Sequence, residues 1–153
     1  MIPGKCISVS ALQNKLGDGA CSPILVARYI GGCDTMSAIF GFGKGKIFTK
    51  LNDDKALHSH CVTLLSESSS GDDVGMSGIR VMTSLYGGKD GESLSKLRYK
   101  AFCNTSLSRR FMAKRLPPSE STVRMHAKHA HLQAVIWASL GKTTLAPQIG
   151  VRR

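Results

Sequence analysis

Apolar residues recur at helical spacing through most of this chain, and this periodicity constrains its fold more than any other feature. The clearest case is residues 119–141, where apolar positions alternate steps of four and three and so share one helix face: Val123, Ala127, Ala130, Ala134 and Trp137. We expect this stripe, its tryptophan included, to be buried in the core. Ser119 is suited to cap the start of this helix, and Gly141 lies near its end.

Shorter stretches with similar spacing predict further helices. We expect helices over 8–16, from Ile24 after Pro23, from Asp34 or Thr35 to Phe40, from Lys46, over 74–86 and from Leu94. The run 24–27 is apolar on every side and indicates a buried helix, with a buried strand as the alternative. Nearly every predicted element is helical. We therefore expect a mainly α fold, a helical bundle, with one domain over residues 1–145 and a flexible tail over 146–153.

The charge balance favours a polyanionic partner. Lys and Arg number 21 and Asp and Glu number 10, which leaves a net charge of +11. Nucleic acid is the first candidate and an acidic membrane face the weaker one. No apolar run approaches the ~18 residues of a membrane span, and the five cysteines are scattered without a C-x-x-C pair. We expect reduced thiols, no membrane association and an intracellular protein, and we consider the nucleus as its compartment.

The segment 32–46 has the residue spacing that points most directly to a chemical function. Asp34 precedes a glycine turn, Gly41-Phe42-Gly43, which opens into a basic helix. A turn between two short helices can point its backbone N–H groups outward, and such groups together with a helix N-terminus hold a phosphate. Lys44 and Lys46 would supply charge, and Asp34 would suit Mg²⁺ or Mn²⁺. In the alternative interpretation Asp34 caps a helix and the glycines only turn the chain.

The run from Gly32 to Leu51 resembles the helix-turn-helix arch of the flap endonucleases, within the PIN-like superfamily of 5′ nucleases. The pattern of that family is G-[SC]-D-[YT], five intervening residues, G-[IVF]-G and then a basic helix, and it aligns here without a gap. The resemblance implies that Asp34 is one of several carboxylates around Mg²⁺. It also implies that a set of hairpin residues contacts duplex DNA phosphates: Gly41, Phe42, Gly43, Lys44 and Lys46. Lys44 stands where the family often has proline.

Most of the chain also resembles a widely multiplied group of animal proteins associated with mobile elements. Three motifs of that group occur in the same order, G-C-D-T-x-S-A-x-x-G-x-G-K from Gly32, L-R-Y-x-x-F from Leu97 and L-P-P-S from Leu116. His126, Lys128 and Trp137 continue the third motif. The group's His and Thr ahead of G-C-D are Arg28 and Gly31 here, so no role is carried over to them.

The expected site lacks most of what a nuclease needs. Hydrolysis with two metal ions requires a cluster of carboxylates, and this chain offers Asp34 and little else in a suitable place. We therefore expect the C-terminal portion of a larger ancestral protein, without the α/β nuclease core and inactive unless a separate segment supplies it. The expected function is binding of the DNA backbone by a 5′ nuclease-like remnant. The alternatives are a non-enzymatic basic nucleic-acid-binding domain and a truncated product with no selected function.

Two groups of histidines are candidates for further sites. The run from His58 to Cys61 contains zinc-type ligands, but no second pair completes a tetrahedral site. His126, His129 and His131 lie among basic residues on the longest predicted helix, and we expect them on a solvated, partly cationic face, with nucleic-acid contact as the alternative.

Overall fold

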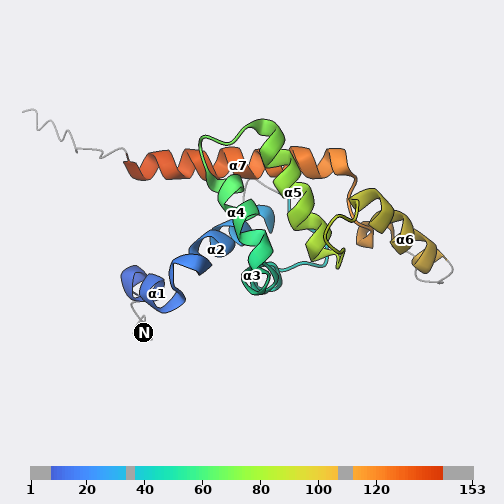
Figure 1. The fold of residues 1–153 in the computed structure, drawn as a ribbon, viewed down its shortest axis with the longest axis horizontal. Helices are drawn as coiled ribbons and strands as arrows, with labels where there is room; N and C mark the ends of the chain where they lie inside the picture. Colours follow the sequence, from blue (N-terminus) through green and yellow to red (C-terminus); the bar gives the residue numbers. More distant parts are fainter. Residues whose placement is uncertain (1–7, 34–36, 107–111, 143–153) are drawn as a thin grey trace, which may run out of the picture.

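The computed structural model describes residues 8–33, 37–106 and 112–142, and within them the fold is mainly α-helical, as expected. These residues form seven α-helices, two short 3₁₀ helices and no β-strand. The elements are α1 (Val9–Leu16), α2 (Asp18–Ile30), α3 (Lys44–Asp53), η1 (Lys55–Leu57), α4 (His58–Leu65), α5 (Gly71–Leu85), α6 (Leu94–Ser106), η2 (Ala113–Arg115) and α7 (Glu120–Lys142). In Figure 1 the long α7 runs along one side and α5 crosses it, while α1 and α6 lie at opposite ends. None of the helices in the described ranges has the length and apolar content that a membrane span requires.

The core lies where α5 and α7 face α2, α3 and α4. Its buried side chains come from all five helices, among them Ile30, Ile47, Cys61, Met82 and Val123. Of the seven helices, α6 contributes only Leu94 to this core. The buried core is therefore formed almost entirely by residues 18–85 and 120–134.

Local signals set the starts of the two central helices. The Ser70 hydroxyl accepts a hydrogen bond from the Asp73 amide (3.2 Å), and Asp72 and Asp73 place negative charge at the positive end of α5. The Ser119 hydroxyl accepts from the Thr122 amide (3.3 Å), which confirms Ser119 as the cap of α7. Both caps satisfy amide groups that a helix leaves without partners in its first turn.

A glycine allows α5 and α7 to approach each other closely. A Cβ added at Gly78 would lie 2.3 Å from the Cβ of Ala127, far inside van der Waals contact. Ala127 belongs to the stripe predicted from the sequence, and Val123, Ala127, Ala130 and Ala134 are all buried. Small residues on both helices thus set the distance between them.

The stripe of α7 is not buried to its end. Trp137 is 60% exposed, so the prediction that this side chain belongs to the core was wrong. Figure 1 shows the reason, because the C-terminal end of α7 projects beyond the helices that cover its middle. The spacing defined the face correctly, but not how far the partner helices extend.

The second helix also differs from its prediction. It begins at Asp18 rather than at Ile24, and Pro23 lies inside it and is fully buried. The run 24–27 is not wholly buried, contrary to the prediction, because Ile24 (40%) and Leu25 (45%) are exposed. Val26 and Ala27 are buried. Helix α2 packs on one side against α3, α4 and α7, so two of the four positions are buried and the other two are exposed.

Replacement of Gly78 tests the close contact of α5 with α7. Alanine is the better helix former by about 1 kcal/mol, but its methyl group would overlap Ala127. We expect Gly78→Ala to lower the free energy of unfolding by about 1 to 3 kcal/mol in urea denaturation. Gly78→Ala combined with Ala127→Gly should recover part of the loss.

The matched control is Gly19→Ala in α2, where an added Cβ meets nothing within 4 Å. This change should leave stability equal or raise it by up to about 1 kcal/mol. A Gly78→Ala protein as stable as the control variant would contradict the close approach.

Candidate nucleic-acid interface

The glycine turn of the predicted hairpin is open and has one position that requires glycine. The Phe42 amide donates a hydrogen bond to the Ile39 carbonyl (3.2 Å), which closes a tight turn. Gly41 in this turn has φ +84°, a value that side-chain-bearing residues rarely adopt. A Cβ at Gly41 or Gly43 would meet nothing within 4 Å, so the backbone here faces open space.

The segment before the turn is not the helix predicted from the sequence. Residues 37–39 have no regular structure, and Phe40 and Gly41 form the turn. Gly32 has φ +92°, and a Cβ on it would lie 2.6 Å from the Cα of Ala38, so Gly32 and Ala38 are in close contact. The side chains from Ser37 to Phe40 then line a cavity against α5 and α7, and this packing replaces the expected helical turn.

Helix α3 begins at the hairpin with basic residues and no side-chain cap. Gly43 occupies the capping position with extended backbone (φ −76°, ψ 155°), and no side chain bonds the first amides. The Ile47 amide donates a hydrogen bond to the Gly43 carbonyl (3.1 Å), which is the first such bond of the helix. The amides of Lys44, Gly45 and Lys46 therefore come before the regular hydrogen bonds of α3. All three residues are exposed. The first turn contains no acidic residue, unlike the first turns of α5 and α7.

Phe42 fixes the hairpin to the end of α5. Its ring meets that of Tyr86 edge to face, with centroids 4.9 Å apart and planes inclined by 66°. The Lys46 ammonium lies 4.8 Å from the centroid of the same Phe42 ring. Burial raises the pKa of the Tyr86 hydroxyl, and nearby Arg98 partly opposes that rise. Through this ring contact Tyr86 anchors the turn, and Phe42 is half-buried.

A second lysine reaches the hairpin from a distant segment. The Lys114 ammonium, from η2, lies 4.4 Å from the centroid of the Phe40 ring. The motif 41–46 did not include Lys114 or Phe40. Lys114 and Arg115 are adjacent basic residues in the sequence, but only the folded chain brings Lys114 beside the Phe40 ring. Two ammonium groups therefore stand next to two rings that are separated by Gly41.

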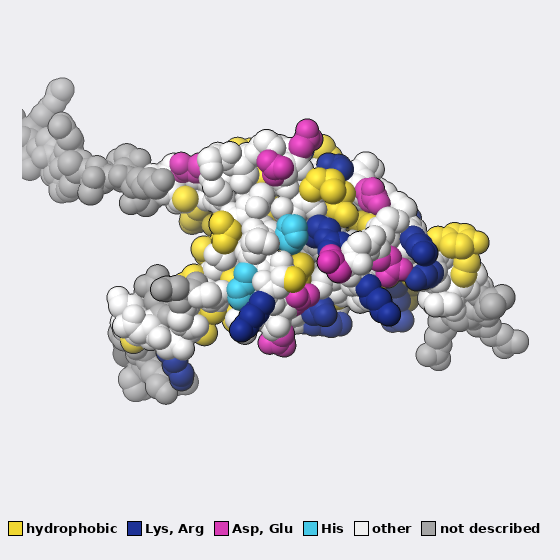
Figure 2. Space-filling view, in the orientation of Figure 1, with side chains coloured by type: hydrophobic (Ala, Val, Ile, Leu, Met, Phe, Trp, Pro, Cys, Tyr) yellow, Lys and Arg dark blue, Asp and Glu magenta, His cyan; other side chains and the backbone are white. Residues whose placement is uncertain are grey.

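Further basic side chains continue from the hairpin along α3. A groove of about 340 Å³ is lined by Phe42, Lys46, Thr49, Lys50, Asp53 and Leu85. In Figure 2 most of the visible Lys and Arg side chains lie over the half of the molecule that carries α3 and α6, with Asp and Glu side chains interspersed among them. Two further basic pairs of the sequence that could neutralise phosphates, 109–110 and 152–153, lie outside the described residues.

Asp34, the predicted metal ligand, also lies outside the described residues. Within the described ranges no group of three or more His, Cys, Asp or Glu side chains is arranged to hold a metal ion. The motif residues from Gly41 to Lys46 are contiguous at the hairpin, and they are the part of the predicted site that can be placed.

The histidine groups have structural hydrogen bonds. His126 Nε2 lies 3.0 Å from the Ile30 carbonyl oxygen and His131 Nδ1 lies 3.0 Å from that of Leu64, so each connects α7 to another helix. The prediction of a solvated face is wrong for these two, which are partly buried, and only His129 is exposed.

The residues around Cys61 point into different environments. His60 Nδ1 is 3.2 Å from the Ser77 hydroxyl, and burial, followed by the charge of Arg80, lowers the pKa of His60. Cys61 is fully buried, and burial raises the pKa of its thiol to about 11. A neutral thiol inside the core is a packing residue rather than a nucleophile.

No family model, curated protein or solved structure is significantly similar to the chain.

Replacement of single glycines tests the backbone of the hairpin. Gly41→Ala should lower the free energy of unfolding by about 1 to 2 kcal/mol, because alanine is strained at positive φ even though space is open. Gly45→Ala, in the first turn of α3 with equally open space, should raise it by up to about 1 kcal/mol. Thermal and urea unfolding measure both, and changes of the same sign in the two variants would contradict the turn.

Proposed function

We propose that this chain binds the phosphate backbone of duplex DNA through the hairpin 40–43 and the start of α3. The proposal includes descent from a 5′ nuclease-like protein of a mobile element. Binding is independent of base sequence, because backbone amides and lysines contact phosphates and do not read base edges.

The observation that carries the proposal is the charge at the start of α3. Lys44 and Lys46 stand at the positive end of a helix dipole, where each cation is unfavourable by about 0.3 to 1 kcal/mol. No carboxylate in the first turn compensates them. A phosphate placed there would interact favourably with both ammonium groups and with the exposed amides of the first turn.

The anchoring of the hairpin supports the same role. Phe42 packs on Tyr86 and so fixes the turn before any ligand arrives. Lys114 extends the positive charge to the other side of Gly41. A pre-formed turn loses less conformational freedom on binding than a mobile one, and this favours affinity.

The proposed role is binding rather than cleavage. A helix-turn-helix arch in this chain would have α3 as its second helix, whereas residues 37–39 before the turn are not helical. A Mg²⁺ ion at Asp34 would need further carboxylates, which we assign to a separate nuclease-core segment.

A second candidate function is diffuse electrostatic binding of nucleic acid. It is favoured by the net charge of +11 and by the exposed lysines and arginines of α6, which are not part of the hairpin. Under this alternative every exposed cation contributes to a similar degree.

A pair of matched double variants separates the two functions. Lys44→Ala with Lys46→Ala removes the charge at the hairpin, and Lys15→Ala with Lys128→Ala removes the same charge from exposed positions on α1 and α7. Binding to a random-sequence duplex is measured by fluorescence anisotropy over a series of salt concentrations.

We expect the hairpin variant to weaken binding and to reduce the slope of log K against log salt by about two, one for each lost phosphate contact. The control variant should change the slope much less. Equal losses in the two variants would contradict the hairpin site and favour diffuse binding, and no binding by the unmodified chain would contradict both.

A further inference from the structure

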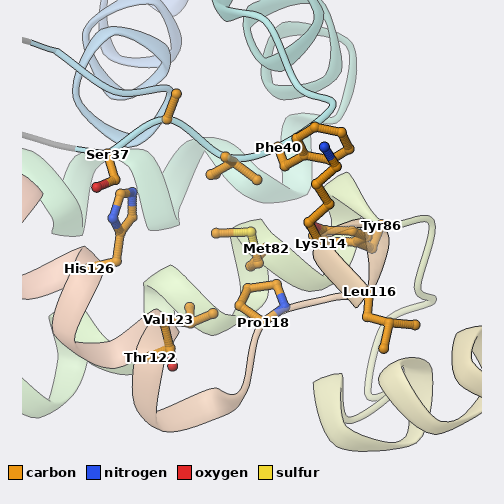
Figure 3. A pocket seen from close by; sticks show the side chains of 12 residues that line it. Ser37, Phe40, Met82, Tyr86, Lys114, Leu116, Pro118, Thr122, Val123 and His126 are labelled. Atoms are coloured by element: carbon orange, nitrogen blue, oxygen red, sulfur yellow. The ribbon is translucent and has the colours of Figure 1, made fainter. Parts of the chain in front are cut away.

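A cavity of about 220 Å³ lies next to the hairpin and shares Phe40 with it. Figure 3 shows it between the segment 37–40, helix α5 and the start of α7. Its walls are mostly apolar and include Ile39, Phe40, Met82, Tyr86, Leu116 and Val123. It is smaller than the roughly 300 to 1,000 Å³ of sites for drug-sized ligands, so it suits a single small ring system.

Polar groups stand at one end of the cavity and a cation at the other. Figure 3 shows Ser37 and His126 facing each other across one end. His126 Nε2 lies 3.0 Å from the Ile30 carbonyl oxygen, so Nε2 must carry the proton that it donates. In the neutral ring Nδ1 is then an acceptor, and the Ser37 hydroxyl can both donate and accept.

The other end of the cavity is formed by Phe40 and Lys114. The Lys114 ammonium stands 4.4 Å from the centre of the Phe40 ring, and both residues line the cavity. An aromatic ring beside an exposed ammonium group can contact a flat ring and an attached anion together.

We propose that this cavity binds a planar heteroaromatic ring of nucleobase size, with an attached phosphate on Lys114. The apolar walls contact the faces of the ring, and His126 Nδ1 and the Ser37 hydroxyl bond its polar edge. A purely apolar ligand would leave those two groups without partners, and a bare phosphate would leave the walls without contact.

The ring can come from a free nucleotide or from an unpaired base of a bound nucleic acid. We assign it to the nucleic acid, because Lys114 and Phe40 flank the same turn as the phosphate site. This assignment rests on the proposed function. A base stacked in a duplex cannot enter such a cavity, so the base must be unpaired.

Isothermal titration of the full chain with three probes tests the ligand class. Adenosine 5′-monophosphate and adenosine should bind, and ribose 5-phosphate should bind at least about tenfold more weakly than the monophosphate. Lys114→Ala should weaken binding of the monophosphate and leave that of adenosine unchanged. Failure of both adenine compounds to bind, or equal binding of ribose 5-phosphate, would overturn the proposal.

Two neighbouring exposed residues of α7 supply a matched pair of variants. Thr122 lines the cavity and Ser121 does not, while both hydroxyls bond the Ser119 hydroxyl, at 2.8 and 3.0 Å. Thr122→Phe fills the cavity and should weaken adenosine binding by at least about tenfold, whereas Ser121→Phe should leave it unchanged. Equal affinities in the two variants would overturn the site.

Competition then identifies the source of the ring. A short single-stranded oligoadenylate should displace the monophosphate from the unmodified chain. Failure to displace it would overturn the nucleic-acid assignment and leave a site for free nucleotides. Duplex binding by the Thr122→Phe protein is measured in parallel, so that loss of the cavity and loss of the hairpin contact are distinguished.

Discussion

The close contact between α5 and α7 is the constraint on which the rest of the structure depends. At Gly78 the two backbones approach so closely that a single added methyl group would overlap Ala127. This contact fixes the C-terminal half of α5, which carries Met82 and Tyr86 toward the segment 37–42. Tyr86 then anchors Phe42, and Phe42 fixes the turn that begins α3. The position of the candidate interface is therefore determined by packing in the core.

The electrostatic arrangement at the start of α3 differs from that at the starts of α5 and α7. Helices α5 and α7 begin with a serine cap and acidic residues, which is the combination that stabilises an isolated helix start. Helix α3 begins with glycine and two lysines, which leaves its positive end uncompensated. Such a helix start gains more from an external anion than the other two do. The Lys46 and Lys114 ammonium groups lie beside the aromatic rings of Phe42 and Phe40, which do not neutralise either charge.

Local periodicity predicted most helices of the fold. The predictions that were wrong concern features that depend on tertiary packing. The spacing of apolar residues predicted α1, α3, α5, α6 and α7, and it predicted Ser119 as a cap, because these features depend on neighbouring residues. It gave no helix over 58–65, where only Cys61 and Leu64 are buried and the other positions carry little helical pattern. It placed Trp137 in the core because spacing defines a face and not the extent of the covering helices. The cavity beside Phe40 and the approach of Lys114 depend on segments far apart in the chain, which no local pattern reports.

Direct observation of backbone amides tests the central claim, that the start of α3 holds phosphate. The measurement is a titration of the ¹⁵N-labelled full chain with random-sequence duplex DNA, followed by amide chemical shifts. The account predicts the largest changes at the amides from Gly43 to Lys46, with smaller changes along α6 and none concentrated on α1. Unchanged amides at 43–46, together with large changes elsewhere on the surface, would contradict it.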